Sequence, residues 1–370
     1  IYRSTDGGKT WQHVLAINDD AGVVDLAADP ANPSLLYAAA WQVRDYPWLD
    51  YFEPMSGPGS GIYRSTDGGV TWTRLAGNGW PQGSIGRIGL AVAHTAQGTR
   101  IYATVASDAA GGVWRSDDGG DHWQRVNTDS ETFGNWYFSR LTVDPRNPDV
   151  VYSAGQSIRR SSDGGKTWTI IKGAPGGDDY HFLWIDPQHP DYWITASDQG
   201  AVVTTDDGRT WSSWYNQPTG QFYHVAADDR FPYWIYSGQQ DSGTIGAASR
   251  SDYGALTFRD WHPVGGDERD YMLPDPDDPN LVFGSGMGGR VSRFDASTGQ
   301  VANVSPWPVN SYGANPLTVK YRYGWVTPMA FTPTQPRALL YGAQVLFQST
   351  DEGDHWQVIS PDLTGTTAQA

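Results

Sequence analysis

The chain of 370 residues contains no cysteine, which excludes a disulfide framework, a zinc ribbon, a thiol nucleophile and an iron–sulfur cluster. Basic residues are also scarce, since 25 Lys and Arg stand against 41 Asp and Glu and give a net charge of −16. Such a chain repels a phosphate backbone or an anionic membrane surface, so we predict no nucleic-acid partner. No apolar run approaches the roughly 18 residues of a membrane span, and no transmembrane segment is predicted.

The residues that are abundant point to many short strands joined by turns. The chain has 44 glycines and 24 prolines, while only 18% of its residues are charged. Aromatic residues make up 13%, and 18 of them are tryptophan. This composition favours one large all-β architecture over two ordinary domains. The chain begins at Ile1 without Met, so we expect that processing or truncation removed what came first.

One motif, Ser-x-Asp-x-Gly-x-(Thr/His)-Trp, returns along the chain, with Thr in place of Ser in one copy. Its copies occupy residues 4–11, 65–72, 116–123, 161–168, 204–211 and 349–356, and decayed copies lie near Ser251 and Asp295. Each copy follows a short β-rich run and precedes another, which predicts a hairpin turn. Asp and Ser side chains can bind the backbone N–H groups of a tight turn, and glycine permits positive φ. We therefore predict a structural role for the motif carboxylates: Asp6, Asp67, Asp118, Asp163, Asp206 and Asp351.

A second signature lies between the motif copies and consists of an apolar strand, a turn resembling Asp-Pro-x-x-Pro, and a strand ending in an aromatic residue. Together the two signatures predict four-stranded units that repeat at roughly 40–50 residues, the pattern of β-propeller blades. Seven inner strands are expected from residue 22 onward, which favours a seven-bladed propeller. We predict an outer half-blade or closing hairpin at 1–15, the propeller at 16–361 and a tail or linker at 362–370.

The repeated motif resembles the Asp-box, or BNR repeat, of sialidases, two-propeller xyloglucanases and sortilin-type receptors. Residues 217–224, 236–241 and 291–295 are similar to a group of bacterial exported proteins described as sortilin-like (VPS10-type) or as glycosyl hydrolases. Members of that group are typically longer than this chain. The resemblance implies that the Asp-box turns lie on the bottom face, while ligands bind at the top of the central channel.

The channel mouth is where side chains of the inner strands are predicted to converge. Strand side chains alternate between faces, so the fifth and seventh residues before each turn anchor share one face. Most of these positions are polar or aromatic, namely Arg87, Tyr137, Ser139, Asp179, His181, Gln221, Tyr223, Glu268, Asp270, Trp325 and Thr327. The sixth position is mostly apolar and is expected to pack between sheets, although Arg269 occupies it in one strand. A ligand site is one interpretation, and an ordinary wet channel is the other.

Four of these residues are candidate catalytic groups: Asp179, His181, Glu268 and Asp270. Opposed carboxylates are what glycoside hydrolysis requires, one as acid and the other as base or nucleophile. Asp179 and His181 also offer the oxygen and imidazole ligands of a metal site that another carboxylate would complete, and Asp179 could instead pair with Arg87. The hydrolytic interpretation needs no cofactor or metal, and none is predicted.

Loops on the same face are expected to add binding groups. Trp41 and Trp48 lie in a long aromatic segment, and flat rings stack on sugars or anchor peptides. That segment could equally be a lid packed on a neighbouring blade or on a second domain. Gln240 and Asp241 carry amide and carboxylate groups of the kind that bind hydroxyls. The predicted ligand-binding set is Arg87, Tyr137, Gln221, Tyr223, Trp325, Trp41, Trp48, Gln240 and Asp241.

The sequence thus predicts an exported, carbohydrate-active propeller, extracellular or periplasmic, that hydrolyses a polysaccharide. A sialidase is disfavoured because no Arg-Ile-Pro occurs and Arg87 is the one arginine in phase at the channel mouth. The alternative is a non-catalytic propeller that binds a peptide in the sortilin manner or serves as an accessory subunit or assembly factor. A second propeller or a protein partner is compatible with both interpretations.

Overall fold

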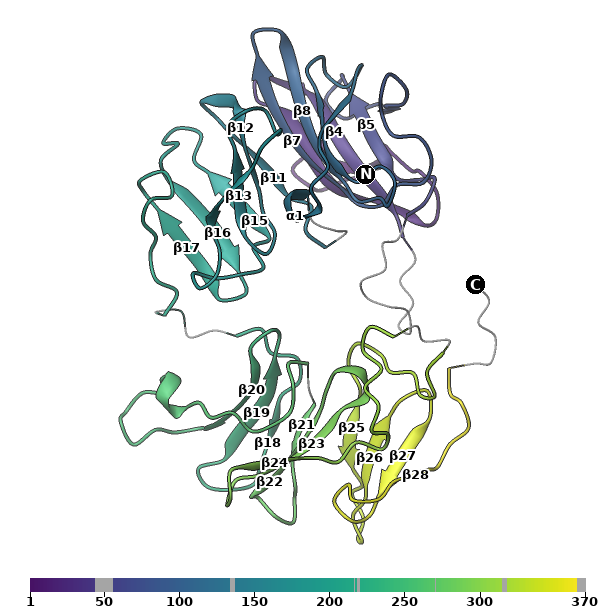
Figure 1. Cartoon of the computed structure of the whole chain (residues 1–370), viewed down its shortest axis with the longest axis vertical. Coiled ribbons are helices and arrows are strands. Elements are labelled where there is room, and N and C mark those ends of the chain that lie inside the picture. The colour runs from purple at the N-terminus through teal and green to yellow at the C-terminus, as the bar shows by residue number, and fades with distance from the viewer. Residues whose placement is uncertain are drawn as a thin grey trace. The chain divides into compact units, whose positions relative to one another are not determined.

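A computed structural model describes residues 1–43, 56–133, 137–215, 217, 220–269, 271–314 and 318–364. These residues form two compact units, the first ending at Gln217 and the second beginning at Gly220. Each unit is a series of antiparallel sheets in which consecutive strands are neighbours (Figure 1). The predicted all-β fold with four-stranded propeller blades is confirmed. The number of blades in a closed ring stays a prediction.

The first unit contains a two-stranded hairpin and four larger sheets. The hairpin joins β1 (Tyr2–Arg3) and β2 (Gln12–His13). Three sheets have four strands: β3 to β6 (Ala21–Asp29, Asn32–Gln42, Gly61–Ser65, Thr73–Arg74), β7 to β10 (Ile88–Thr95, Gly98–Val105, Gly112–Ser116, Gln124–Asn127) and β11 to β14 (Leu141–Asp144, Asn147–Ser153, Ile158–Ser161, Thr169–Lys172). The next has three strands, β15 to β17 (Phe182–Ile185, Trp193–Ser197, Gly200–Thr204). A short helix, α1 (Ser130–Phe133), precedes β11.

The second unit contains one three-stranded sheet and two four-stranded sheets. They are β18 to β20 (Ala226–Ala227, Trp234–Gln239, Gly243–Ala248), β21 to β24 (Met272–Pro274, Leu281–Ser285, Val291–Asp295, Gln300–Asn303) and β25 to β28 (Met329–Phe331, Leu339–Gly342, Leu346–Ser349, Gln357–Val358). In the first of these sheets the fourth strand is reduced to a bridge between Gly246 and His262, next to the decayed motif copy. Two 3-10 turns, η1 (Phe258–Asp260) and η2 (Met287–Gly289), complete the unit. No helix in the described part of the chain is long and apolar enough to span a membrane.

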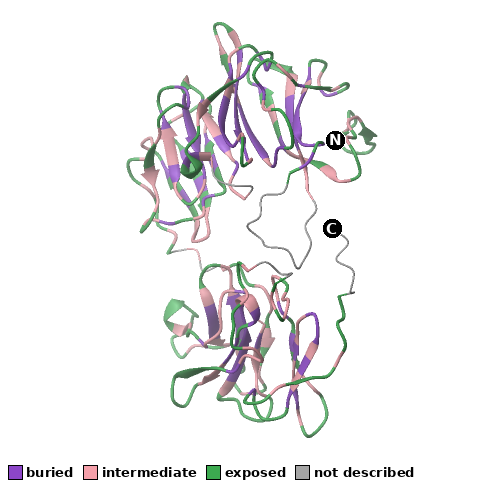
Figure 2. Cartoon of the chain, turned by 45° about the vertical axis from the view of Figure 1, so that its right-hand side comes forward, coloured by how far each residue is buried: buried purple, intermediate pink, exposed green. Residues whose placement is uncertain are grey.

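One aromatic residue of each second strand forms the centre of the packing between sheets. The residues are Tyr37, Tyr102, Tyr152, Trp193, Tyr236, Phe283 and Tyr341, each at most 1% exposed. Burying a side chain of this size is worth about 2–3 kcal/mol. Figure 2 shows buried residues along the middle strands of the sheets and exposed residues at their turns. The aromatic residue that ends the predicted second strand is therefore a core position in every sheet of three or four strands.

The Asp-box turn uses its carboxylate to hold the backbone. In the copy at 65–72, the Ser65 hydroxyl donates to Asp67 at 2.8 Å, and Gly69 N–H donates to Ser65 Oγ at 2.9 Å. Asp67 also accepts hydrogen bonds from Thr71 N–H at 2.9 Å and from the Thr71 hydroxyl at 2.6 Å. Gly68 and Gly69 have φ of 70° and 83°, which is why glycine is needed there. The backbone N–H bond to the carboxylate recurs around Asp6, Asp118, Asp163, Asp206 and Asp351. In the copies of Asp118 and Asp351 a histidine ring nitrogen replaces the threonine hydroxyl.

Three of the Asp-box turns, at 65–72, 116–123 and 161–168, also accept a hydrogen bond from an arginine of the preceding sheet. Arg3 donates to the Gly68 carbonyl at 3.0 Å, Arg64 to Gly119 at 3.0 Å, and Arg115 to Gly164 at 3.1 Å. In each case the arginine immediately precedes the first residue of one motif copy, and the glycine lies in the next copy. A charged donor on a backbone carbonyl is stronger than a neutral one, so these bonds fix the spacing of consecutive turns.

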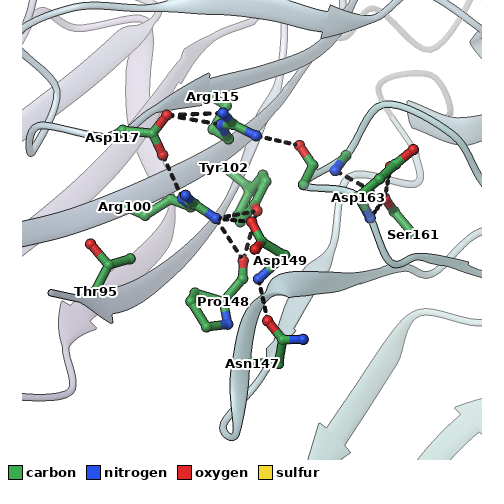
Figure 3. A network of polar contacts seen from close by, with 12 residues as sticks. Thr95, Arg100, Tyr102, Arg115, Asp117, Asn147, Pro148, Asp149, Ser161 and Asp163 are labelled. Carbon is green, nitrogen blue, oxygen red and sulfur yellow. Dashed lines mark hydrogen bonds and ion pairs between the residues drawn. The ribbon is translucent and has the colours of Figure 1, made fainter. Parts of the chain in front are cut away.

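A larger polar network accompanies the Arg115 bond (Figure 3). Arg100 of β8 pairs with Asp117 and with Asp149, the latter in the next sheet. The hydroxyl of Tyr102 donates to the carbonyl of Pro148 at 2.7 Å. The sheets β7 to β10 and β11 to β14 are thus joined by polar contacts at the start of β12 and at an Asp-box turn, as well as by buried aromatic residues.

We predict that Asp163→Asn destabilises the chain by about 1–2 kcal/mol, because an amide cannot accept all the hydrogen bonds that this carboxylate takes from Ser161 and Thr167. Burial opposes the shift, but those hydrogen bonds lower the pKa of Asp163 to about 2. A lowered pKa gives stability that is present above the unfolded value and lost as pH falls, so the deficit should vanish between about pH 4 and pH 2. Urea unfolding at several pH values measures it.

The control is Asp108→Asn, which changes an exposed aspartate outside the motif and should leave the unfolding midpoint unchanged. A deficit in Asp163→Asn that persists unchanged at pH 2 would contradict the role given to its carboxylate.

Candidate functional site

Three segments of the second unit come together just before their inner strands. Residues 221–223 precede β18 and continue its direction, because Tyr223 N–H donates to the Gly238 carbonyl at 3.1 Å and Gln240 N–H to the Gln221 carbonyl at 3.0 Å. Residues 267–269 precede β21, and Trp325 precedes β25. The chain thus brings the predicted channel-mouth positions of three consecutive sheets into one place.

A chain of hydrogen bonds connects the first and third of these sheets. Trp325 Nε1 donates to the Tyr223 hydroxyl at 3.0 Å, and that hydroxyl donates to Gln240 Oε1. Gln240 Nε2 donates in turn to Asp241 Oδ1 at 2.9 Å. Tyr223, Gln240 and Trp325 are half-buried, and Asp241 is exposed. Predicted ligand-binding residues therefore orient one another while their side chains keep some contact with solvent.

Glu268 lies next to these hydrogen-bonded side chains, and its pKa is shifted by its surroundings. Its Oε2 accepts a hydrogen bond from Asp241 N–H at 2.8 Å, and its side chain is 15% exposed. Burial, together with a hydrogen bond and charge repulsion from the Asp241 carboxylate, raises the pKa of Glu268 to about 7. Near neutral pH the group is thus partly protonated and can donate a proton.

Asp241 reaches Glu268 because of a tight turn. It lies in the loop between β19 and β20 and adopts φ of 53°, followed by Gly243 at 79°. Aspartate tolerates this left-handed conformation better than most residues, yet the conformation is uncommon outside glycine. The strained turn directs the Asp241 N–H toward the Glu268 carboxyl, and such strain often marks functional sites.

Arg269 is the residue that sequence reasoning left out of the site. It was placed among the packing positions, and it is indeed only 3% exposed. Its guanidinium lies 3.3 Å from the centre of the Trp325 ring, and its Nε is 3.7 Å from Glu268 Oε1. A charged residue in an otherwise apolar row was the signal that could have revealed it.

A separate group of predicted residues gathers in the first unit. The Arg87 guanidinium lies 5.7 Å from the Trp41 ring centre and donates to the Tyr137 carbonyl at 3.4 Å. The Tyr137 and His181 rings meet edge to face, with centroids 4.9 Å apart. Burial lowers the pKa of Arg87, but the arginine remains a cation at any physiological pH. These side chains form a mixed aromatic and cationic surface.

Four predicted site residues remain, and the structure describes two of them, Asp179 and Gln221. Asp179 is half-buried with φ of 49°, and it belongs to the first unit, whereas Glu268 belongs to the second. Gln221 is exposed beside Gln240. Asp270 and Trp48 lie outside the described residues. The pairing of Asp179 with Glu268 or Asp270 therefore stays a prediction.

The first unit also contains a cavity of about 570 Å³ that sequence reasoning did not foresee. Its walls come from the inner strands β3, β7, β11 and β15. Asp25 and Arg140 pair across it at 2.5 Å, and Phe182 and Trp184 expose their rings to it. Arg140 is out of phase with the channel-mouth positions, so alternation alone gave no reason to select it.

Comparison with known proteins bears on the repeats and on the chain as a whole. Residues 2–13 and 63–74 match the family model described as BNR/Asp-box repeat, which confirms the predicted motif. A xyloglucanase from Paenibacillus sp. is 26% identical over 381 residues, covering 90% of this chain and 33% of that protein. A xyloglucanase from Hypocrea jecorina is 27% identical over 221 residues, covering 58% of this chain and 21% of that protein.

Among solved structures, a GH74 enzyme from Niastella koreensis aligns at 14% identity with a TM-score of 0.43, covering 97% of this chain and 66% of that one. The chain spans about a third or less of the length of the two xyloglucanases above.

The raised pKa of Glu268 predicts a stability change that needs no substrate. A group with a raised folded pKa gives stability that is present below its unfolded value and lost as pH rises through its folded value. The window here is about pH 4.5 to 7. Wild type should therefore lose up to about 2 kcal/mol relative to Glu268→Gln between pH 4.5 and pH 8. Urea unfolding at both pH values measures this difference.

The matched control is Glu131→Gln at an exposed glutamate of the first unit, whose stability should follow wild type across the same range. A constant difference between wild type and Glu268→Gln at all pH values would contradict the raised pKa.

The chain thus carries BNR/Asp-box repeats within a blade-type all-β fold, and it is similar in sequence to xyloglucanases over most of its length.

Proposed function

We propose that the chain belongs to a secreted glycoside hydrolase that acts on a polysaccharide, with Glu268 as the proton donor. The observation that carries this proposal is the half-buried Glu268 carboxyl, whose Oε2 accepts a hydrogen bond from Asp241 N–H at 2.8 Å. Burial and the neighbouring Asp241 carboxylate raise the pKa of Glu268 to about 7. A glycosidic oxygen is a poor leaving group until it is protonated, and a carboxyl group that keeps its proton near neutral pH can supply that proton. Asp241 helps to keep the proton on Glu268.

Asp179 and Asp270 stay the predicted candidates for the second carboxylate that hydrolysis requires. A retaining enzyme holds its two carboxyl groups about 5 Å apart, and an inverting enzyme holds them about 6.5–9.5 Å apart. Asp241 acts on the pKa of Glu268 through a hydrogen bond and charge repulsion, so we assign it to tuning the acid. His181 would orient a substrate or a water beside Asp179.

The neighbouring side chains suit a sugar polymer. Half-buried aromatic rings such as Trp325 and Tyr223 offer apolar faces for sugar rings, and the Gln240 amide can bind hydroxyl groups. Similarity to xyloglucanases favours xyloglucan, a β-glucan with xylose branches, as the polymer to test first. We further propose, from the resemblance described under the sequence analysis, that the protein is exported and that a second propeller contributes to the site.

A second candidate function is a non-catalytic propeller that binds a polysaccharide or a peptide. The ion pair between Glu268 and Arg269 at 3.7 Å favours it, because a carboxylate held by a buried cation can have a purely structural role. In that case the site would recognise its ligand without cleaving it.

We predict that Glu268→Gln lowers the rate of xyloglucan hydrolysis by at least about 100-fold, since the amide cannot donate the acidic proton. Release of reducing ends measures hydrolysis, and affinity electrophoresis in gels containing xyloglucan measures binding. The exposed Glu131→Gln variant is the control and should retain full activity.

Two results would refute the enzymatic proposal: full activity in Glu268→Gln, or no hydrolysis of any tested glycan by wild type. Binding of xyloglucan or another glycan without hydrolysis, abolished by Trp325→Ala, would instead support the non-catalytic function.

A proton donor with a pKa near 7 also fixes the pH dependence of the reaction. The fraction of protonated Glu268 falls as pH rises, so kcat/KM should decline above about pH 7, approaching tenfold per pH unit. Initial rates from pH 5 to pH 9 give the profile. A rate that is constant from pH 6 to pH 9 would show that Glu268 is not the acid.

A further inference from the structure

Arg269 combines a full positive charge with almost complete burial. Its side chain is 2% exposed, and burial lowers its pKa, although arginine stays charged under all physiological conditions. Removing a cation from water is costly unless nearby groups compensate for the lost hydration. The buried Arg269 cation therefore requires neighbouring groups that compensate for its lost hydration.

Aromatic rings supply one part of that compensation. The guanidinium carbon lies 3.3 Å from the centre of the Trp325 ring and 5.4 Å from that of Tyr312, both within the range of cation–π attraction. The indole of Trp325 is held at its other end by the hydrogen bond from Nε1 to Tyr223. One face of the indole is thus covered by Arg269, and its rotation is restrained at both ends.

The Glu268 carboxyl supplies the other part. Arg269 Nε lies 3.7 Å from Glu268 Oε1, while Asp241 N–H holds Glu268 Oε2 at 2.8 Å. One oxygen of the carboxyl thus accepts a hydrogen bond from the loop between β19 and β20, while the other faces the Arg269 cation of segment 267–269 at an ion-pair distance without a hydrogen bond. Asp267, Tyr223 and Tyr312 are further titratable groups among the described residues that act on Arg269.

The two neighbours of Glu268 act on its charge in opposite directions. Asp241 and burial favour the protonated carboxyl, whereas the Arg269 cation favours the carboxylate. Without Arg269, the carboxyl would hold its proton more tightly and would be anchored through one oxygen only.

We propose that Arg269 is the positioning residue of this site, which fixes the Trp325 ring and the Glu268 carboxyl relative to each other and balances the charge of Asp241. The inference rests on the proposed role of Glu268, but its test does not depend on hydrolysis. Arg269 acts through these two side chains and need not touch the substrate.

The chain offers an unusually direct test, because its four glutamates are at positions 53, 131, 268 and 352. Protein labelled with ¹³C at the glutamate carboxyl gives four NMR signals, and Glu268→Gln identifies the relevant one. In Arg269→Met, which keeps an unbranched apolar stem and removes the charge, the titration midpoint of Glu268 should rise by about one pH unit or more. In Arg269→Lys, which keeps the charge but not the planar stack, it should rise less.

The carboxyl signals of Glu131 and Glu352 are internal controls and should titrate as in wild type. A Glu268 midpoint that stays at its wild-type value in folded Arg269→Met would overturn the proposal. If that variant does not fold, wild type itself decides: the ¹⁵Nε signal of Arg269, assigned with Arg269→Lys, should shift with the same midpoint as Glu268. A signal that does not change with pH would overturn the proposal as well.

If wild type hydrolyses xyloglucan, Arg269→Met should move the alkaline decline of kcat/KM upward by the same interval as the Glu268 midpoint. If wild type is inactive, the two NMR titrations still test Arg269, so failure of the proposed enzymatic function and failure of this inference are distinguishable.

Discussion

The Asp-box turn is the constraint on which the rest of the structure depends. Its carboxylate accepts hydrogen bonds from backbone N–H groups that have no backbone partner in the tight turn. Its glycines at positive φ allow the carbonyl of Gly68, Gly119 or Gly164 to face the preceding sheet. An arginine of that sheet binds the carbonyl, so the geometry of one turn sets the position of the next. Similar sheets can then follow one another while their inner ends diverge in sequence.

The carboxyl groups of this protein differ in pKa because their environments differ, and this difference distinguishes structural acids from a candidate catalytic one. In the turns, each carboxylate accepts several hydrogen bonds. Hydrogen bonds donated by Thr10 lower the pKa of Asp6 to about 2, and hydrogen bonds donated by Thr210 do the same for Asp206. Such groups are charged at all relevant pH values and cannot exchange a proton near neutrality. Glu268 accepts a single backbone hydrogen bond, is half-buried and faces another carboxylate, so the same functional group stays partly protonated.

The sequence was sufficient for the repeats because they depend on local contacts. Motif spacing located the turns, and the aromatic residue ending each second strand, such as Tyr37 or Tyr341, occupies the core as alternation requires. Alternation also placed Tyr223 and Trp325 on one surface, where they are hydrogen bonded.

The roles of Arg269 and Asp241 could not be read in the same way. One depends on a ring contributed by the next sheet and the other on a turn with φ of 53°, and neither is encoded in the residues adjacent to it. Sequence alternation gives the face of a strand, whereas the partner across that face is set by how three sheets converge.

The bond between Trp325 and Tyr223 has an evolutionary consequence. It joins the first and third sheets of the second unit, while Glu268 and Arg269 come from the sheet between them. Repeat proteins grow by copying one unit, but no single copy contains this site, and a newly duplicated blade would separate its contributors. Once such a site has formed, insertion of a blade at this point is disfavoured, so the order of these three repeats becomes fixed although their individual sequences can continue to drift.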